Sequence, residues 1–199
     1  MRRPVIALAV LVAASMAGLP RTAVAQDDAT RSRFGGTADA FAEKYGEPTS
    51  SVAHPSRAGT TVLTYAVFGF QDVTALVYDG AVVGLALRPV AGETWTTDAV
   101  QTVMTDFAPS DAEYDDVRLL IGPSDAGVQI AIRAASDGVA DQVEPEAYAE
   151  LEAGGEPGDL HAVLFAVPGG RYSGVSLNLG AAETAALSGT VVDVAWVAP

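Results

Sequence analysis

Four carboxylates fall within six residues of one another, at Asp111, Glu113, Asp115 and Asp116. Calcium is a hard cation that prefers oxygen ligands of this kind. The run has neither the ligand spacing of an EF-hand nor the glycine that such a loop requires. The sequence leaves two interpretations open, a calcium site in a loop and a solvated acidic loop, and it favours the solvated loop.

The chain has two histidines, His54 and His161, and no cysteine. Without cysteine there are no disulfides, thiolate zinc sites, iron–sulfur clusters or cysteine nucleophiles. His54 precedes Pro55, and we expect it to be an exposed loop residue. His161 shares one side of a predicted strand with Val163 and Phe165, so we expect a partly buried, hydrogen-bonded side chain rather than a catalytic base. No nucleophile elbow, phosphate loop or zinc-protease motif occurs, and no cofactor is expected.

The residues that we predict to bind a partner lie in two turns. Phe70 falls in the predicted turn from Gly69 to Asp72, where a polar residue would be usual. An exposed aromatic side chain at such a tip would serve as an anchor for a partner, although core packing would also account for it. Asp79-Gly80 lies between two predicted strands and is a strong hairpin signal, because both residue types tolerate positive φ. The predicted contact residues are therefore Phe70, Asp79 and Gly80.

The N-terminus has the features of a secretory signal. Two arginines at Arg2-Arg3 precede an apolar run from Val5 to Leu19, and Ala23-Val24-Ala25 provides small residues for cleavage. We predict a signal peptide over residues 1–25 and export to the periplasm or the exterior. The alternative is an uncleaved membrane anchor, but the apolar run is shorter than the ~20 residues that span a bilayer.

The charge balance restricts the partners. The chain has 11 basic and 25 acidic residues, a net charge of −14. Cleavage would remove three arginines and leave 8 − 25 = −17. Such a charge repels nucleic acid and anionic lipid, so we expect no nucleic acid partner and no membrane insertion. The composition is typical either of proteins from salt-loving bacteria or of acidic secreted proteins encoded by GC-rich DNA, and both interpretations stay open.

The elements that position these residues form one α+β domain over residues 37–199, after a flexible linker over residues 26–36. Capping, periodicity and turn signals predict an antiparallel sheet with about three helices on one face, in the order α-βββ-α-ββ-α-βββ. The predicted helices are 37–45, 98–107 and one that starts at Pro145, with a further helical turn over 181–187. The predicted strands are 62–68, 72–78, 81–87, 117–121, 128–133, 160–167, 172–179 and 190–197. An echo of 65–69 in 165–169, at an offset of 100 residues, raises the hypothesis of a duplicated module.

One part of the chain resembles a known kind of module. Phe41-Ala42-Glu43-Lys44-Tyr45-Gly46-Glu47-Pro48 is followed by an extended run that closes at Tyr78-Asp79-Gly80-Ala81-Val82-Val83. Over residues 37–88 this pattern is similar to bacterial envelope domains of the SmpA/OmlA type and to the β-lactamase-inhibitor-protein fold. The resemblance implies a binding or assembly role. The chain departs from those families in having neither a lipidated cysteine nor disulfides.

Together these features favour an exported, non-enzymatic binding or assembly module whose partner is an envelope or secreted protein. In this hypothesis the outer sheet face or the hairpin tips make the contact. The alternative is a small secreted hydrolase whose carboxylate and histidine site the sequence does not identify.

Overall fold

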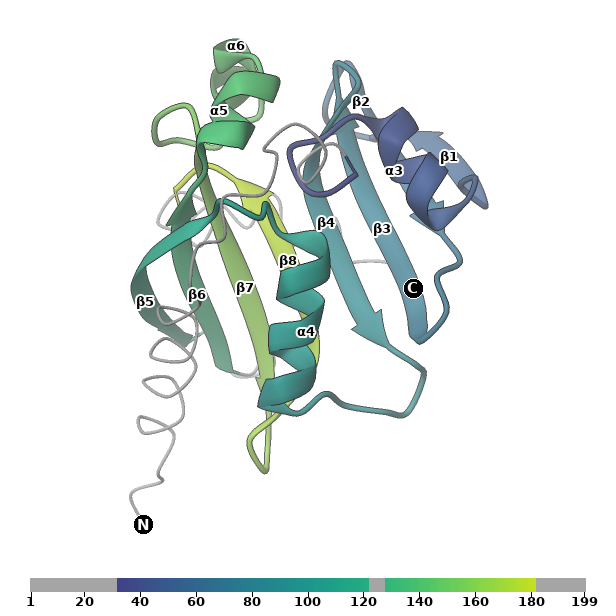
Figure 1. The fold of residues 1–199 in the computed structure, drawn as a ribbon, viewed down its shortest axis with the longest axis vertical. Helices are drawn as coiled ribbons and strands as arrows, with labels where there is room; N and C mark the ends of the chain where they lie inside the picture. The colour runs from purple at the N-terminus through teal and green to yellow at the C-terminus, as the bar shows by residue number, and fades with distance from the viewer. Residues whose placement is uncertain (1–31, 122–127, 182–199) are drawn as a thin grey trace.

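One antiparallel sheet runs through the described chain, which comprises residues 32–121 and 128–181 of the computed structural model (Figure 1). The helices within those residues are α3 (Ala38–Tyr45), α4 (Thr97–Phe107), α5 (Asp137–Gln142) and α6 (Pro145–Glu150). The strands are β1 (Ser50–Ala53), β2 (Thr60–Tyr65), β3 (Phe70–Tyr78), β4 (Ala81–Pro89), β5 (Glu113–Ile121), β6 (Val128–Ala135), β7 (Asp159–Val167) and β8 (Arg171–Leu179). The predicted α+β class is confirmed.

Each half of the sheet is a four-stranded meander that follows a helix. In the described residues the strand order is β1-β2-β3-β4-β8-β7-β6-β5, and the two meanders meet where Leu87 of β4 pairs with Val175 of β8. The second half also carries α5 and α6 between β6 and β7. This repeated order is the one expected of a duplicated module. The sequence echo does not match this repeat. It aligns residues at the end of β2 with residues at the end of β7, whereas the repeated order of strands makes β3 the counterpart of β7.

Local capping rules account for where α3 and α4 begin and for where α3 ends. The Thr37 side chain accepts a hydrogen bond from Ala40 N (3.2 Å), and the Thr96 side chain accepts one from Ala99 N (3.2 Å). Gly46 ends α3 with φ of 92°, a conformation that glycine adopts without strain. The predicted start and end of α3 are therefore confirmed.

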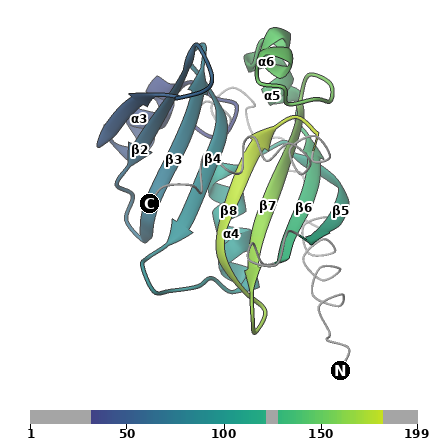
Figure 2. The ribbon, with the colours of Figure 1, turned by 180° about the vertical axis from the view of Figure 1, so that it is seen from behind.

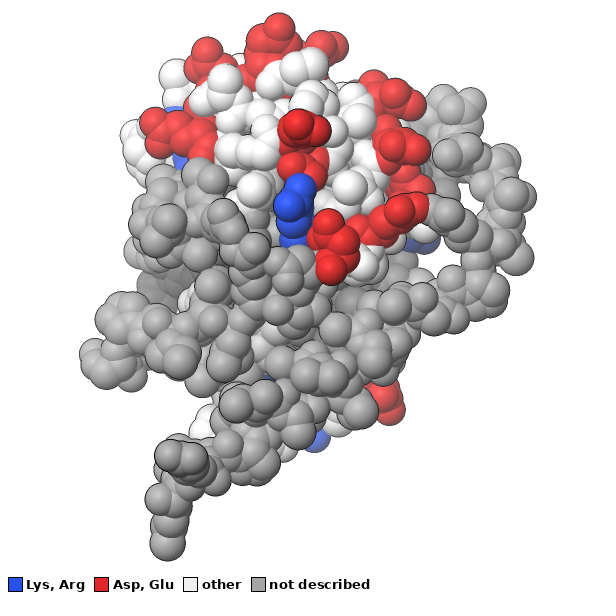
Figure 3. Space-filling view, turned by 90° about the vertical axis from the view of Figure 1, so that its left-hand side faces the viewer, with Lys and Arg blue, Asp and Glu red and all other residues white. Residues whose placement is uncertain are grey.

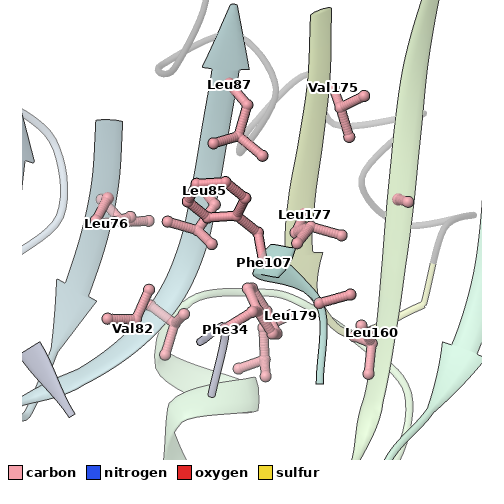
Figure 4. Packing of buried hydrophobic residues seen from close by; sticks show 14 of the residues in the cluster. Phe34, Leu76, Val82, Leu85, Leu87, Phe107, Leu160, Val175, Leu177 and Leu179 are labelled. Atoms are coloured by element: carbon pink, nitrogen blue, oxygen red, sulfur yellow. The ribbon is translucent and has the colours of Figure 1, made fainter. Parts of the chain in front are cut away.

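The core lies between α4 and the sheet. The buried side chains of α4 recur at helical spacing on one side of the helix and are Val100, Val103, Met104 and Phe107. Figure 4 shows Phe107 near Leu85 of β4 and Leu177 of β8, which come from opposite sides of the junction between the meanders. All three of these side chains are at most 2% exposed. The helix thus covers the junction with continuous apolar surface.

The predicted linker is wrong in its last residues. Phe34 is fully buried, and its backbone N donates to Phe107 O (2.9 Å), while Gly35 N donates to Val82 O (2.8 Å). A Cβ at Gly35 would lie 2.6 Å from Val139 Cγ2, so only glycine fits there. The folded domain therefore begins before Thr37, because an apolar side chain in the predicted linker completes the core.

The predicted helix arrangement also needs correction. Both α3 and α4 lie on one face of the sheet, whereas α5 and α6 lie at one end of it (Figure 1, Figure 2). Neither β1 nor α5 was predicted, and the observed order in the described residues is α-ββββ-α-ββ-αα-ββ. The predicted signal peptide 1–25, linker residues 26–31, helical turn from 182 onward and strand 190–197 lie outside the described residues. No helix within 32–121 and 128–181 has the length and apolarity to cross a membrane.

Carboxylates dominate the end of the molecule that α5 and α6 form. Figure 3 shows acidic side chains gathered over the upper part of this face, where these helices lie. From residue 134 to residue 170 the sequence has no lysine or arginine. The exposed carboxylates of this end are Asp137, Asp141, Glu144, Glu146, Glu150, Glu152 and Glu156.

Salt is expected to stabilise the protein. The Debye length falls from ~30 Å at 0.01 M to ~3 Å at 1 M salt, so added NaCl screens the repulsion among these carboxylates. Glu146 and Glu150 lie four residues apart on α6, a like-charge pair that costs about 0.2–0.5 kcal/mol. We expect the melting temperature to rise with NaCl, and the variant Glu146→Lys/Glu150→Lys to show a flatter rise. Thermal unfolding monitored by circular dichroism measures both, and a melting temperature independent of NaCl would contradict the prediction.

Candidate functional site

An exposed phenylalanine marks the turn between β2 and β3. Phe70 N donates to Val67 O (3.1 Å) across this turn, and Gly69 has φ of 88°. The Phe68 side chain between them is fully exposed. Val90, which is 42% exposed, directly follows Pro89, the residue that pairs with Phe70. Phe68 and Val90 therefore lie at the same end of the β3–β4 pair, and we call them the apolar tip.

The apolar tip stands on a rigid aromatic base. The Phe70 ring lies edge-on to the Trp95 ring (centroids 5.7 Å apart) and to the Phe107 ring (5.4 Å). Trp95 is itself fixed, because its backbone exchanges two hydrogen bonds with Tyr172 at the start of β8 (2.8 and 3.0 Å). Phe107 belongs to the core of α4. The turn that carries Phe68 is thus held at its base by packed rings.

This arrangement corrects the prediction for Phe70. The sequence placed Phe70 at an exposed tip, but Phe70 is the first residue of β3 and is half-buried against Trp95. The cause is the end of β2, which stops at Tyr65 and not at Phe68 as predicted. The exposed aromatic side chain is therefore Phe68, which the sequence analysis assigned to a strand. The sequence signal for this turn is Gly69, because glycine readily adopts the positive φ that a turn at Phe68 and Gly69 requires.

Asp79 and Gly80 form the predicted hairpin turn at the other end of β3. Both have positive φ (46° and 79°), and both are exposed. Gly80 O also accepts a hydrogen bond from Ala38 N (2.9 Å), which ties the turn to the start of α3. At about 3.3 Å per residue, the nine residues of β3 separate this turn from Phe70 by about 26 Å. The structure does not bring the three predicted contact residues together, and their role in binding a partner stays a prediction.

The acidic run at 111–116 is not one loop. Asp111 caps α5: its Oδ1 accepts from Ser136 Oγ (2.7 Å) and its Oδ2 accepts from Gly138 N (2.8 Å). Glu113 and Asp115 are exposed in β5, which has a bulge between Tyr114 and Asp116.

The predicted calcium ligands therefore have different environments. Asp111 has both carboxylate oxygens occupied by α5, and the Asp116 side chain lies outside the described ones. In the described part of the chain no three His, Asp or Glu side chains gather closely enough to hold a metal ion. The calcium site stays a prediction that the observed contacts of Asp111 do not support.

His161 is hydrogen-bonded, as predicted, and it is fully buried where partial burial was expected. Its Nδ1 lies 2.9 Å from Gly180 O, and because a carbonyl only accepts, Nδ1 carries the proton. Burial lowers the pKa of His161, and the hydrogen bond to Gly180 acts in the opposite direction. The lone pair on Nε2 has no hydrogen-bond partner in the part of the chain that the structure describes. The imidazole is therefore neutral at pH 7.

The carboxylate nearest to His161 in the sequence is already engaged. Asp159, two residues earlier in β7, forms an ion pair with Arg133 (3.3 Å) and accepts a hydrogen bond from Glu156 N (2.8 Å). Asn178 pairs directly opposite His161 and donates to Ser176 Oγ (3.1 Å). Across residues 32–121 and 128–181, neither imidazole is hydrogen-bonded to a carboxylate. No serine–histidine–carboxylate arrangement is therefore assembled among the described residues.

Comparison with known proteins gives neither a matching family model nor a matching curated protein. Two solved structures resemble this chain with a TM-score of 0.36 each. The first is a cysteine-rich secretory protein from Staphylococcus aureus, with 10% identity over 73% of this chain and 44% of that one. The second is an extracellular protein with an SCP domain from Bacillus anthracis, with 18% identity over 81% of this chain and 48% of that one. The chain spans less than half the length of either protein.

Proposed function

We propose that this protein is an exported, non-enzymatic module that binds another protein through the apolar tip. The observation that carries the proposal is the full exposure of Phe68 on a hairpin turn. Export is supported by the signal-peptide features of residues 1–25, namely Arg2-Arg3, the apolar run and Ala23-Val24-Ala25.

The energetics of the tip support binding. Burying a phenylalanine side chain gains about 1.5–3 kcal/mol, and aromatic anchors contribute most of the free energy of many protein interfaces. Phe70 packs against Trp95 and Phe107, so the turn is already ordered before a partner arrives. An ordered tip loses less conformational entropy on binding than a mobile loop would. Val90 extends the apolar area at the same end of the β3–β4 pair.

The charge of the chain supports a protein partner over lipid or nucleic acid. A net charge of −14 repels anionic lipid headgroups and phosphate backbones over a Debye length. A protein surface with an apolar pocket can accept Phe68 at close range without opposing that charge. The proposed partner is therefore an envelope or secreted protein that buries the Phe68 ring.

A photo-cross-linking experiment in the producing cell tests the contact. The photoreactive residue p-benzoylphenylalanine is placed at Phe68 in one strain and at Asp79, the opposite end of the hairpin, in another. We expect one adduct of defined mass from position 68 and none from position 79. With the partner purified, Phe68→Ala should weaken its affinity about 10- to 100-fold, as loss of an aromatic anchor does.

The same strains show how the proposal fails. An adduct from position 79 alone would move the contact to the Asp79-Gly80 turn. Equal adducts from both positions would indicate non-specific contact. Unchanged affinity of Phe68→Ala for a partner captured at position 68 would contradict the anchor role directly.

A further inference from the structure

The loop between β1 and β2 holds three buried polar atoms that have no hydrogen-bond partner among the described residues. These atoms are His54 Nε2, Arg57 Nη1 and Thr60 Oγ1. His54 is only 6% exposed and Thr60 only 3%, although Pro55, at the start of the loop, is exposed. The prediction that His54 is an exposed loop residue is wrong, because pairing with β2 holds its side chain at the sheet. Buried polar groups in proteins are nearly always hydrogen-bonded, so three unpartnered ones in a seven-residue loop need a physical explanation.

The hydrogen bonds of the loop fix which of these atoms donate. Ser56 N donates to His54 Nδ1 (3.2 Å), so Nδ1 keeps its lone pair and the ring proton is on Nε2. His54 N donates to Thr60 O (2.8 Å), which sets these two residues opposite each other across the hairpin. Side chains directly opposite in an antiparallel pair project from the same face. His54 and Thr60 therefore present their side chains, each with an unpartnered polar atom, on the same face of the hairpin.

Arg57 adds a positive charge to the same group. Thr60 N donates to Arg57 O (3.3 Å), so the loop folds back with Arg57 beside Thr60. Burial and, second to it, the positive charge of Arg57 lower the pKa of His54. Burial also lowers the pKa of Arg57, and the carboxylate of Glu152 acts against that shift. Nη1 of Arg57 nevertheless has no hydrogen-bond partner within the described residues. Arg57 is thus the charged side chain of the loop, and the three buried polar atoms of the loop find no acceptor among the described residues.

From this arrangement we infer that the 54–60 loop binds a small oxyanion through His54 Nε2–H, Arg57 Nη1 and Thr60 Oγ1. Carboxylates and phosphates share the acceptor oxygens that these donors need. The loop has one positive charge, that of Arg57, and the rest of the chain is strongly negative, with a net charge of −14 for the whole chain. This balance favours a monovalent carboxylate over a doubly charged phosphate, because the second negative charge would be repelled. The site lies at the end of β2 where Thr60 pairs with Tyr78, opposite the end that carries the apolar tip. It is therefore independent of the proposed docking function.

Nuclear magnetic resonance of the full chain tests this site. The protein has two histidines, so ¹⁵N-histidine labelling gives two imidazoles, and His161→Asn assigns them. Sodium acetate and sodium phosphate are titrated separately at pH 7, with NaCl holding the ionic strength constant. We expect the His54 ring resonances to shift and saturate with acetate, at lower concentration than with phosphate, while those of His161 stay unchanged.

Variants identify the donors. Arg57→Gln should abolish saturation, whereas Arg171→Gln, which alters an exposed arginine bonded to Thr94, should leave it intact. Thr60→Val keeps the shape of the side chain, removes one donor and should weaken acetate binding about tenfold. Glu152→Gln removes the opposing charge and should strengthen binding. If Arg57→Gln does not fold, Thr60→Val and Glu152→Gln decide the result.

Three results would overturn the inference. Shifts that grow linearly with anion concentration, equally in Arg57→Gln, would show bulk electrostatic screening alone. Shifts of both histidines would show a change of the whole fold. Absence of any shift would show that the donors are satisfied within the chain. Tighter binding of phosphate than of acetate would retain the oxyanion site and overturn its preference for a carboxylate.

Discussion

Replacing Phe70 with serine is expected to lower the melting temperature by roughly 6–12 °C, while the same change at Phe68 leaves it nearly unchanged. Loss of a packed aromatic side chain costs about 3 kcal/mol or more, and each kcal/mol shifts the melting temperature of a domain of this size by about 2–4 °C. Phe70 contacts the rings of Trp95 and Phe107, whereas Phe68 is fully exposed. Differential scanning calorimetry of the two variants measures the contrast.

The pair of variants is matched, because both exchange phenylalanine for serine within three residues of one turn. A large loss of stability at Phe68 would show that the ring is packed and would remove the basis for the apolar tip. A negligible loss at Phe70 would show that the aromatic base does not hold the turn. A double variant of Phe70 and Trp95 should cost less than the sum of the two single changes, since their rings contact each other.

Acidification from pH 7 to pH 5 is expected to destabilise the protein through its two histidines. Burial lowers the pKa of both His54 and His161 from the ordinary value of 6.5. Well above pH 6.5 both imidazoles are mostly neutral in the folded and the unfolded chain, so they contribute little to the pH dependence. Below it, the unfolded chain takes up protons that the folded chain does not. Stability therefore falls by at most about 1.4 kcal/mol per pH unit for each histidine, until the folded pKa is reached.

The variant His161→Asn separates the two contributions. Its amide can donate to Gly180 O as Nδ1 does, but it does not titrate. We expect the loss of stability between pH 6.5 and pH 5 to shrink in this variant and to shrink further when His54→Asn is added. Urea unfolding at a series of pH values measures the free energy. The buffer should be Bis-Tris, because acetate and phosphate are the proposed ligands of the 54–60 loop. An identical slope in the wild type and the double variant would assign the effect to carboxyl groups.

Elements defined by short-range signals were predictable from the sequence. Thr37 caps α3 and Gly46 ends it, because both act through backbone groups within four residues. Asp79-Gly80 fixes the β3–β4 hairpin for the same reason. The apolar stripe of α4 repeats with the helical period and faces the sheet.

Elements that depend on distant contacts were not predictable. Strand β1 (Ser50–Ala53) is exposed along its whole length, so it needs no alternation of apolar and polar residues, and its sequence shows none. Pairing with β2 alone makes it a strand. Phe34 is buried because Val82 and Phe107 lie beside it, although its neighbours in the sequence are polar or glycine. Helix α5 contains Gly138, which disfavours a helix, but Asp111 and Ser136 cap it.

The candidate sites follow the same division. The prediction of an exposed aromatic anchor at Phe70 is wrong, because β2 ends at Tyr65 and the exposed ring is that of Phe68. The donors of the 54–60 loop fall within seven residues of the sequence, but their burial appears only when the hairpin pairs with the rest of the sheet. The sequence offers Asp111 as a candidate calcium ligand, but its carboxylate accepts hydrogen bonds at the start of α5, a helix that the sequence did not predict.

The junction of β4 with β8 sets an order in which the chain acquires structure. Every other strand pair joins neighbours along the chain, but this one joins residues 178 − 84 = 94 positions apart at Gly84 and Asn178. Long-range pairs form late, and a chain that emerges N-terminus first completes β1–β4 before β8 exists. During that interval β4 is an uncovered edge whose apolar Val82–Leu87 segment can pair with any free strand. Fragments that end before β8, from premature termination or proteolysis, are therefore expected to aggregate through β4, and a folding helper that occupies this edge would prevent it.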